Sequence, residues 1–481
     1  MSISFNLKQV SRFIGSAMFL GALAVSLYLN NSVPILLVLW PLVLIDRAFL
    51  IPILFTIPLV EGVYATLDTS SNTESIAIAM LAPILGYDLL RKNSVNVPTR
   101  INMLFVAFII MTIVGFIVYR QHGYINKKMA MLYNIPAIPA MGKAIAKTLK
   151  LVFFIVFIKL LVNYGKEYIY KALNLYRTLS PYLILAVVVY TIKFGYVSEK
   201  FGGVLHFGAA HHGDFTATLD ALAVFLFVAI FERRDNYFEK LLSIAALLSL
   251  AYLIMQMGSR NGLLCFCLAA GLSAILVLAK RSGSMIFLMI LTAFVALASA
   301  VIIFKDSPTV NRFIYQMDVE DGGERIAYWY AGFRALEREP ILGLGGDESA
   351  SLWATAIYSP EVEPHIMHDS FLEVAVEYGI LGLVFYLIFV FTIMVWAYQT
   401  YMHALKTEDF VLGTPAVGYT VSIFSSLFIS RVWDTTLFYY LCLIFAIGVL
   451  WLRPSITRIP MRKRKMSLPT LPSPEPAYVL D

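Results

Sequence analysis

Apolar runs of 13 to 20 residues follow one another along almost the whole chain and are separated by short polar stretches. A helix that crosses a bilayer satisfies its own backbone groups and needs about 20 apolar residues. Only 14% of the 481 residues are charged, against roughly a quarter in soluble domains. The chain is therefore predicted to be an all-α polytopic membrane protein, which excludes soluble, disordered, collagenous and disulfide-scaffold classes.

About fourteen segments are apolar enough to be candidate spans. They are 12–29, 33–45, 48–60, 76–90, 101–119, 148–163, 179–194, 217–231, 241–257, 261–279, 285–304, 379–397, 411–430 and 435–452. Two of them, 33–45 and 48–60, are short for a span, so twelve helices are the alternative count. No small-residue cleavage site follows the first run, which we interpret as a retained helix and not a signal peptide.

Lysine and arginine predict the orientation. The tail after 452 contains six basic residues between Arg453 and Lys465, which places the C-terminus in the cytoplasm, and alternation along the spans places the N-terminus there too. Six basic residues from Arg120 to Lys150 fall outside in this scheme and are interpreted as part of an interfacial helix. The net charge of +6 indicates a basic membrane-facing surface and no nucleic-acid partner. The three cysteines lie in apolar runs and are expected to be lipid-buried and unpaired.

This topology predicts one large external loop, 305–378, with twelve acidic and five basic residues up to Asp369. Loops of this length are usually functional. The predicted division of the chain is 1–200 N-terminal transmembrane helices, 201–304 further transmembrane helices, 305–378 large periplasmic loop, 379–452 C-terminal transmembrane helices and 453–481 basic, Pro-rich cytoplasmic tail.

The first candidate site is the polar stretch Gly258–Gly262 between two apolar segments. Its arginine, Arg260, is costly at a membrane boundary unless it is paired or solvated, which makes it a functional candidate. The structural alternative is a snorkelling arginine on a tight Ser-Asn-Gly turn.

The second is a predicted amphipathic helix at 324–338 on the external face, with Ile326, Trp329, Tyr330, Phe333 and Leu336 at helical spacing. Arg325 is expected in its first turn, where the helix dipole disfavours a cation and a ligand or Glu324 would compensate. A solvated interfacial helix is the alternative. The following glycines, 343–346, lack the preceding strand and the lysine of a phosphate-binding loop.

The third is the stretch from His365 into the next span. His368 beside Asp369 has the composition of a general base near neutral pH, whereas Asp369 or Ser370 alternatively caps the following helix. A metal site from four histidines is a weaker alternative without a recognised ligand spacing; it would use His365, His368, His211 and His212. Arg431 is interpreted first as the ion-pair partner of Asp434.

In this order and spacing, the motifs resemble the O-antigen ligase and polymerase superfamily of bacterial envelope glycosyltransferases. The matching segments are Ser259–Gly262, Arg325 with Trp329, Pro340–Gly345, His368–Glu373 and Glu377–Gly382. Asn261 stands where the family usually has glycine, and Asp369 where it usually has asparagine. The resemblance covers about 205–400.

The resemblance implies transfer of a glycan from a polyprenyl diphosphate donor on the periplasmic side of the inner membrane, without metal or cofactor. Arg260 and Arg325 would bind the diphosphate, and His368 would be the catalytic base. Asp369, Glu373, His211, His212 and Arg431 are supporting candidates. The acceptor is a lipid-linked repeat unit for a polymerase, which we favour, or lipid A-core or protein for a ligase. A chain-length regulator is a further expected partner.

A lipid-linked glycan flippase or another transporter is the alternative from a different class. Such a protein would place its charges along a cavity within the spans, whereas here the candidate groups are predicted on one side, beside the large loop. That distribution favours a one-sided enzyme.

Overall fold

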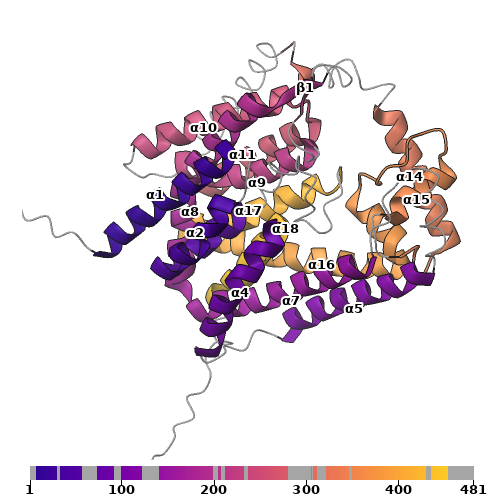
Figure 1. The fold of residues 1–481 in the computed structure, drawn as a ribbon, viewed down its shortest axis with the longest axis horizontal. Coiled ribbons are helices and arrows are strands. Elements are labelled where there is room, and N and C mark those ends of the chain that lie inside the picture. Colours follow the sequence, from indigo (N-terminus) through magenta and orange to yellow (C-terminus); the bar gives the residue numbers. More distant parts are fainter. Residues whose placement is uncertain are drawn as a thin grey trace, which may run out of the picture.

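The computed structural model describes residues 7–29, 33–56, 73–91, 99–121, 140–198, 204–206, 212–231, 237–279, 305, 307–310, 321–345, 349–428 and 435–452. Within these ranges the chain is a bundle of helices (Figure 1). The predicted all-α polytopic architecture is confirmed. Its one departure among the described residues is a short antiparallel hairpin, β1 (Tyr196–Ser198) with β2 (Val204–His206).

The helices follow the predicted apolar runs closely. They are α1 (Leu7–Leu29), α2 (Val33–Ile45), η1 (Arg47–Phe49), α4 (Thr73–Arg91), α5 (Thr99–Gln121), α7 (Ala140–Tyr164), α8 (Lys166–Phe194), α9 (His212–Phe231), α10 (Tyr237–Gln256), α11 (Arg260–Leu278), α14 (Asp321–Arg338), α15 (Ser349–Tyr358), α16 (Ser370–Thr407), α17 (Phe410–Ser425), α18 (Thr435–Ile447) and η3 (Gly448–Leu452). A short apolar helix continues from η1 to Thr56.

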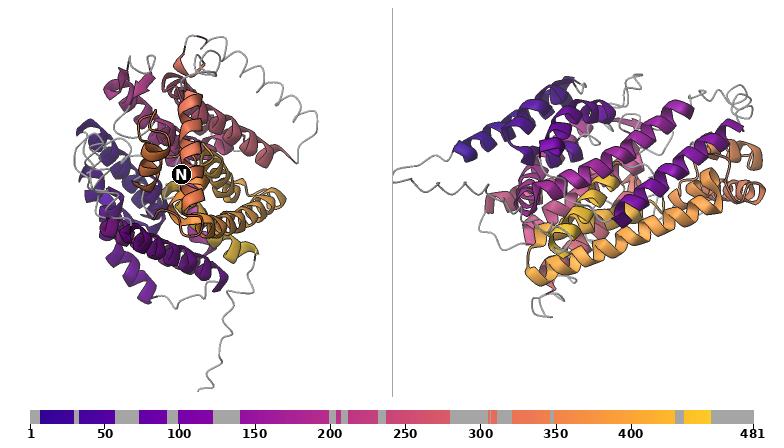
Figure 2. Two further views of the ribbon diagram at one scale, coloured as in Figure 1. Left: turned by 90° about the vertical axis from the view of Figure 1, so that its right-hand side faces the viewer. Right: turned by 90° about the horizontal axis from the view of Figure 1, so that it is seen from below.

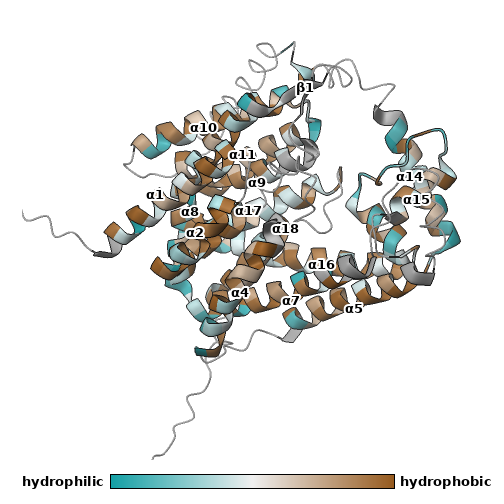
Figure 3. Cartoon of the chain, in the orientation of Figure 1, coloured by the Kyte–Doolittle hydropathy of each residue, from teal (hydrophilic) through white to brown (hydrophobic). Residues whose placement is uncertain are grey.

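Six helices in the described part of the chain are long and apolar enough to cross a membrane, and five more are apolar but shorter. The brown helices of Figure 3 show this apolar character. The count of twelve to fourteen spans stays a prediction, since the expected span at 285–304 lies outside the described residues, as does the tail from 453.

The core of the bundle is formed by α17 and α18, which lie at its centre in Figure 1. Along α18 the side chains from Leu437 to Ile447 are buried. Aromatic rings join α18 to α7, where Phe154 and Phe438 stack with centroids 4.7 Å apart. On the other side, Phe108 of α5 stacks on Phe389 of α16 with centroids 5.0 Å apart. A helix that is apolar all round fits this central position.

Ion pairs link helices in the N-terminal half, at the end of the bundle predicted to face the cytoplasm. Arg47 binds Asp88 of α4 with a 2.7 Å contact, and the buried Arg177 of α8 lies 3.2 Å from Glu239 of α10. The charges in these two pairs have opposite signs and belong to different helices, which is how structural ion pairs hold membrane helices together.

The predicted external loop folds around a small hydrophobic core of its own. It contains α14, which the periodicity predicted at 324–338, and α15, which it did not predict. Both lie at one end of the bundle, beside the start of α16 and the end of α5 (Figures 1 and 2). Their shared core consists of Tyr328, Ala335, Leu344, Ala350, Trp353, Ala354, Ala356, Met367 and Val376. The loop is therefore a packed subdomain on the helical scaffold.

Candidate functional site

Arg260 is the first residue of α11, directly after an N-terminal cap. The Ser259 hydroxyl accepts a hydrogen bond from the Gly262 N–H at 3.0 Å. Its oxygen also lies 2.9 Å from the hydroxyl of Thr216 on α9. A Cβ at Gly262 would lie 2.6 Å from the Thr216 oxygen, so glycine permits the close approach of α9. Arg260 therefore begins a helix, in place of the Ser-Asn-Gly turn of the structural alternative.

The N-terminal ends of α11 and α16 meet at the C-terminal end of α17. The Asn261 side-chain amide donates to the Ser425 hydroxyl at 2.9 Å. The Ser370 N–H donates to the carbonyl of the neighbouring Ser426 at 3.0 Å. Because these two anchors are adjacent, the backbones at Arg260 and His368 are held close to one point. Asn261, the departure from the family's usual glycine, is one of the two links.

Two helices with polar caps thus direct their N-terminal ends to the same region. The helix dipole makes such ends favourable for anions, although the first-turn N–H groups of α16 are already bonded to Ser426 and Asp369. The helix dipole gives the C-terminal end of α17 a partial negative charge, but the Ser426 carbonyl there already accepts a hydrogen bond from the Ser370 N–H. Arg260 adds a positive charge at the start of α11, which favours a phosphate or carboxylate there, whereas the start of α16 carries Asp369 and Glu373.

His368 lies at the start of α16 and is buried. Its φ of +52° is in the left-handed region, which a side-chain-bearing residue rarely adopts. The next residue, Asp369, is the N-cap and accepts hydrogen bonds from Phe371 N–H at 2.9 Å and Leu372 N–H at 2.8 Å. In the structure Asp369 is therefore a helix cap, as the alternative interpretation of the sequence predicted. The cap fixes the chain just after the strained residue, as at many functional sites.

Burial also affects the carboxyl group of Asp369. Removal from water raises the pKa of Asp369, and the two backbone N–H bonds from Leu372 and Phe371 oppose that rise without cancelling it.

The loop helix α14, which contains Arg325, contacts the segment around the same histidine. Tyr328, one helical turn after Arg325, lies with its ring centroid 6.1 Å from that of His368. Trp329 donates from its indole to the Met367 carbonyl at 3.0 Å. Because α14 begins at Asp321, Arg325 lies in the second turn and not the first, which corrects the expected position against the helix dipole.

The apolar stripe predicted for α14 is real but does not pack inward. The buried face consists of Tyr328, Ala331 and Ala335. Four of the stripe's members are exposed instead, namely Ile326, Trp329, Tyr330 and Phe333. The small residues of the inward face let α14 approach α16, where a Cβ at Gly332 would lie 3.0 Å from Leu372.

The glycine turn after α14 docks into a break in α16. Gly379 interrupts the helix with φ +69° and ψ −172°. In a regular helix the carbonyls of 376 and 377 would accept from the N–H groups of 380 and 381. All four groups are instead bonded to the turn at 340–345. The bonds are Leu344 N to Val376 O (2.8 Å), Gly345 N to Glu377 O (2.9 Å), Ile380 N to Pro340 O (2.8 Å) and Leu381 N to Ile341 O (3.4 Å).

This backbone joint explains two of the glycines in the sequence pattern. A Cβ at Gly379 would lie 2.2 Å from the Ile341 oxygen, and one at Gly343 would lie 2.5 Å from the Gly379 nitrogen. Gly343 also has a φ of +69°. The turn and the break are thus two halves of one structure that fixes α14 to the membrane-spanning part of α16.

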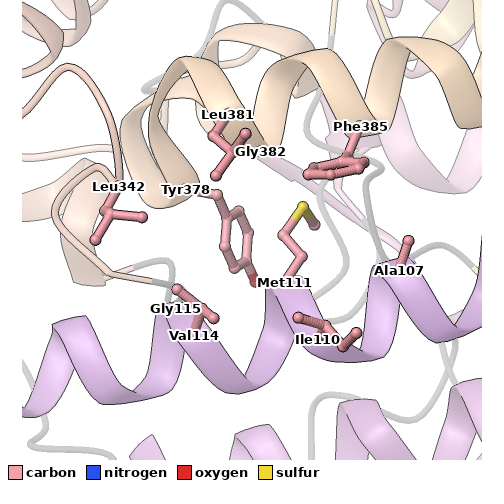
Figure 4. Close-up of a pocket in the computed structure, with 10 residues that line it drawn as sticks. All are labelled: Ala107, Ile110, Met111, Val114, Gly115, Leu342, Tyr378, Leu381, Gly382 and Phe385. Atoms are coloured by element: carbon pink, nitrogen blue, oxygen red, sulfur yellow. The ribbon is translucent and has the colours of Figure 1, made fainter.

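An apolar cavity of about 140 Å³ lies beside this joint, between α5 and α16 (Figure 4). Tyr378 points from α16 toward Met111 of α5, and Leu342 of the glycine turn closes one end (Figure 4). An apolar cavity of about 150 Å³ accommodates a benzene-sized group. Its size and lining fit a short length of hydrocarbon chain.

The remaining predicted residues fall in different places. Glu373 is buried in the first turn of α16. His212 begins α9, whereas His211 and Arg431 lie outside the described residues. No cluster of three metal-ligating side chains occurs among the residues that the structure describes. Analysis of the sequence alone missed Ser425 and Ser426. Asp369, in contrast, precedes an apolar run and is a recognisable cap signal.

A comparison with protein-family models tests the resemblance found in the sequence. Residues 244–387 match the family described as O-Antigen ligase. This segment is similar to an O-antigen ligase domain. The domain runs from α10 through the break in α16, so Arg260, Arg325 and His368 all lie in it, and the superfamily resemblance of the sequence is confirmed. No curated protein matches the chain. The match supports a membrane enzyme of the glycosyltransferase type.

Proposed function

We propose that this protein polymerises the repeat units of a surface polysaccharide, an O-antigen or exopolysaccharide, from a polyprenyl diphosphate-linked donor. The observation that carries the proposal is the meeting of two capped helix ends, α11 with Arg260 and α16 with His368, at Ser425 and Ser426 of α17. We place this site at the periplasmic face of the inner membrane, with both termini in the cytoplasm and the domain boundaries given above.

In this proposal Arg260 and Arg325 bind the donor diphosphate. Cleavage of the glycosyl–phosphate bond leaves negative charge on the diphosphate, and guanidinium groups stabilise such charge by paired hydrogen bonds. The N-terminal end of α11 adds to the same positive potential. The protein groups supply this stabilisation, so the proposed mechanism assigns no step to a metal or cofactor.

His368 is the proposed base. The acceptor hydroxyl gives its proton to the His368 imidazole while its oxygen bonds to the anomeric carbon of the donor sugar. The bond from that carbon to the diphosphate breaks, and the electron pair leaves with the diphosphate. Glu373 is proposed as a supporting group, and so are His211, His212 and Arg431.

The cavity between α5 and α16 supports a lipid-linked donor. It lies next to Gly379, eleven residues along α16 from His368, which corresponds to roughly 16 Å of helix. We propose that the first part of the polyprenyl chain lies there while the head group reaches the arginines. A site at the bilayer surface would thereby take a substrate with one water-soluble and one lipid end.

A ligase that transfers the finished glycan to lipid A-core or protein is the second candidate, because the family description itself names a ligase. The two differ only in the acceptor, and a chain-length regulator is a further expected partner. A flippase is the third, and its charged groups would be expected along a cavity within the spans.

The test compares surface glycan and lipid-linked intermediates on gels from hosts that carry wild type or His368→Ala. Single repeat units in place of a ladder establish the polymerase. Long chains that remain on the polyprenyl carrier, with bare core acceptor, establish the ligase. His403→Ala, at the far end of α16, is the matched control and should leave the ladder unchanged. A normal ladder in His368→Ala would remove His368 from the mechanism and favour the flippase.

A further inference from the structure

A second histidine is stacked on the proposed base. The imidazole rings of His365 and His368 lie with centroids 4.4 Å apart and planes inclined by 24°. The Tyr328 ring lies 5.6 Å from His365 and 6.1 Å from His368. Two aromatic faces, one from the loop and one from α14, are therefore next to the His368 ring.

The position of His365 is fixed by α15. Its N–H donates to the Thr355 hydroxyl oxygen at 3.1 Å, and the same oxygen lies 3.2 Å from the His365 carbonyl. Thr355 is fully buried. Both backbone groups of His365 are thus anchored on a packed helix, and its ring has a defined place beside His368.

On the ring of His365, the Nδ1 atom is buried and has no hydrogen-bond partner among the described residues. No hydrogen bond at this nitrogen therefore competes with the stacked orientation of the ring beside His368.

We infer that His365 is a positioning residue for the proposed base. Its ring and that of Tyr328 orient the His368 imidazole and stabilise the imidazolium that forms during transfer. Cations within about 6 Å of an aromatic centroid gain from this contact. The inference rests on the proposed function, because it assigns His365 a role through His368 in the same reaction.

The charged groups on the elements around His368 define the controls. They are Arg325 on α14, Asp369 and Glu373 on α16, and Arg260 on α11. The described helices α15 and α17 contribute no charged side chain. A variant at position 365 leaves all four charges in place, so a change in its pH profile reports the ring itself.

The experiment measures initial rates of glycan transfer in proteoliposomes with the full chain and lipid-linked repeat units, across pH 5 to 9. His365→Phe keeps the aromatic face and should retain kcat to within about threefold. His365→Ala should lower kcat by about tenfold or more with little change in KM. Because His368 becomes less basic, the acid-side midpoint of the profile should move down by about 0.5–1 pH unit.

Several results would overturn the inference. Phe and Ala variants that lose activity equally, with an unmoved midpoint, would mean that His365 only supports the fold. An Ala variant with wild-type kcat and profile would mean that it has no role. Melting temperature separates loss of fold from loss of orientation. Failure of the proposed function is a different result, in which His368→Ala itself keeps the wild-type rate.

Discussion

Replacement of Gly379 by alanine should release the loop subdomain from the membrane-spanning part of α16. The backbone there has φ +69° and ψ −172°, a region that is essentially restricted to glycine. The new methyl would lie 2.2 Å from the Ile341 oxygen. Since that oxygen belongs to the docked turn, the methyl and the turn cannot occupy their places together.

The cost follows from the four backbone bonds between the turn and the break. At roughly 0.5–1.5 kcal/mol each, they contribute roughly 2–6 kcal/mol. A straightened α16 would recover two of them as ordinary helical bonds, which leaves a net loss of about 1–3 kcal/mol. An alanine kept at positive φ would cost roughly 1–3 kcal/mol in strain in addition to the clash. Either way α14 loses its fixed position relative to His368.

The assay combines melting temperature in detergent with transfer activity in proteoliposomes. Gly379→Ala should lower the melting temperature and reduce transfer, and Gly343→Ala should do the same because its methyl would meet the Gly379 nitrogen. Gly271→Ala in α11 is the control, since nothing lies within 4 Å of its Cβ. It should be neutral or stabilising by up to about 1 kcal/mol. Wild-type stability and activity in Gly379→Ala would refute the prediction that this joint fixes α14 relative to His368.

Three further outcomes are expected. Burial raises the pKa of Asp369 above its ordinary value of 3.8. The contribution of Asp369 to the stability of the fold is therefore complete below pH 3.8 and is lost as the pH rises through the raised pKa of the folded protein. Asp369→Asn retains a good cap and should remove this pH dependence, whereas Asp369→Ala should lower the free energy of unfolding by about 1 kcal/mol. Unfolding measured at pH 4 and pH 7 tests both variants. An equal pH dependence in Asp369→Asn and wild type would contradict the reasoning. Val114→Trp, which fills the cavity between α5 and α16, should raise KM for the lipid-linked donor. Ile113→Trp, on the exposed face of the same helix, should leave KM unchanged. Equal KM values in the two variants would argue against a lipid chain in the cavity. Asn261→Ala, which removes the bond to Ser425, should lower kcat several-fold, and an unchanged kcat would show that this link does not position Arg260.

Much of the helical scaffold could be predicted from the sequence, because periodicity and hydropathy depend on neighbouring residues. The loop helix was predicted at 324–338 and found at Asp321–Arg338. Its inward face was not, because Ala331 and Ala335 pack by being small and not by being hydrophobic. The hydrophobic stripe that marked the helix therefore identified its exposed side.

The features that tertiary contacts determine could not be predicted. The span expected at 379 belongs to a helix that begins at Ser370, and a break at Gly379 separates the two parts. That break exists only because a segment almost 40 residues earlier supplies its hydrogen bonds. The link of Arg260 and His368 through Ser425 and Ser426 likewise depends on packing, since serines near a helix end carry no signal of their partner.

The joint between the glycine turn and α16 consists of main-chain atoms on both sides. Every residue except proline offers the same N–H and C=O groups, so side chains beside the glycines, such as those of Leu342 and Ile380, are not needed to hold it. Both are exposed and are free to change with the lipid or glycan that they meet. A loop fixed in this way can acquire a different substrate preference by surface substitution while the distance from α14 to the membrane stays the same.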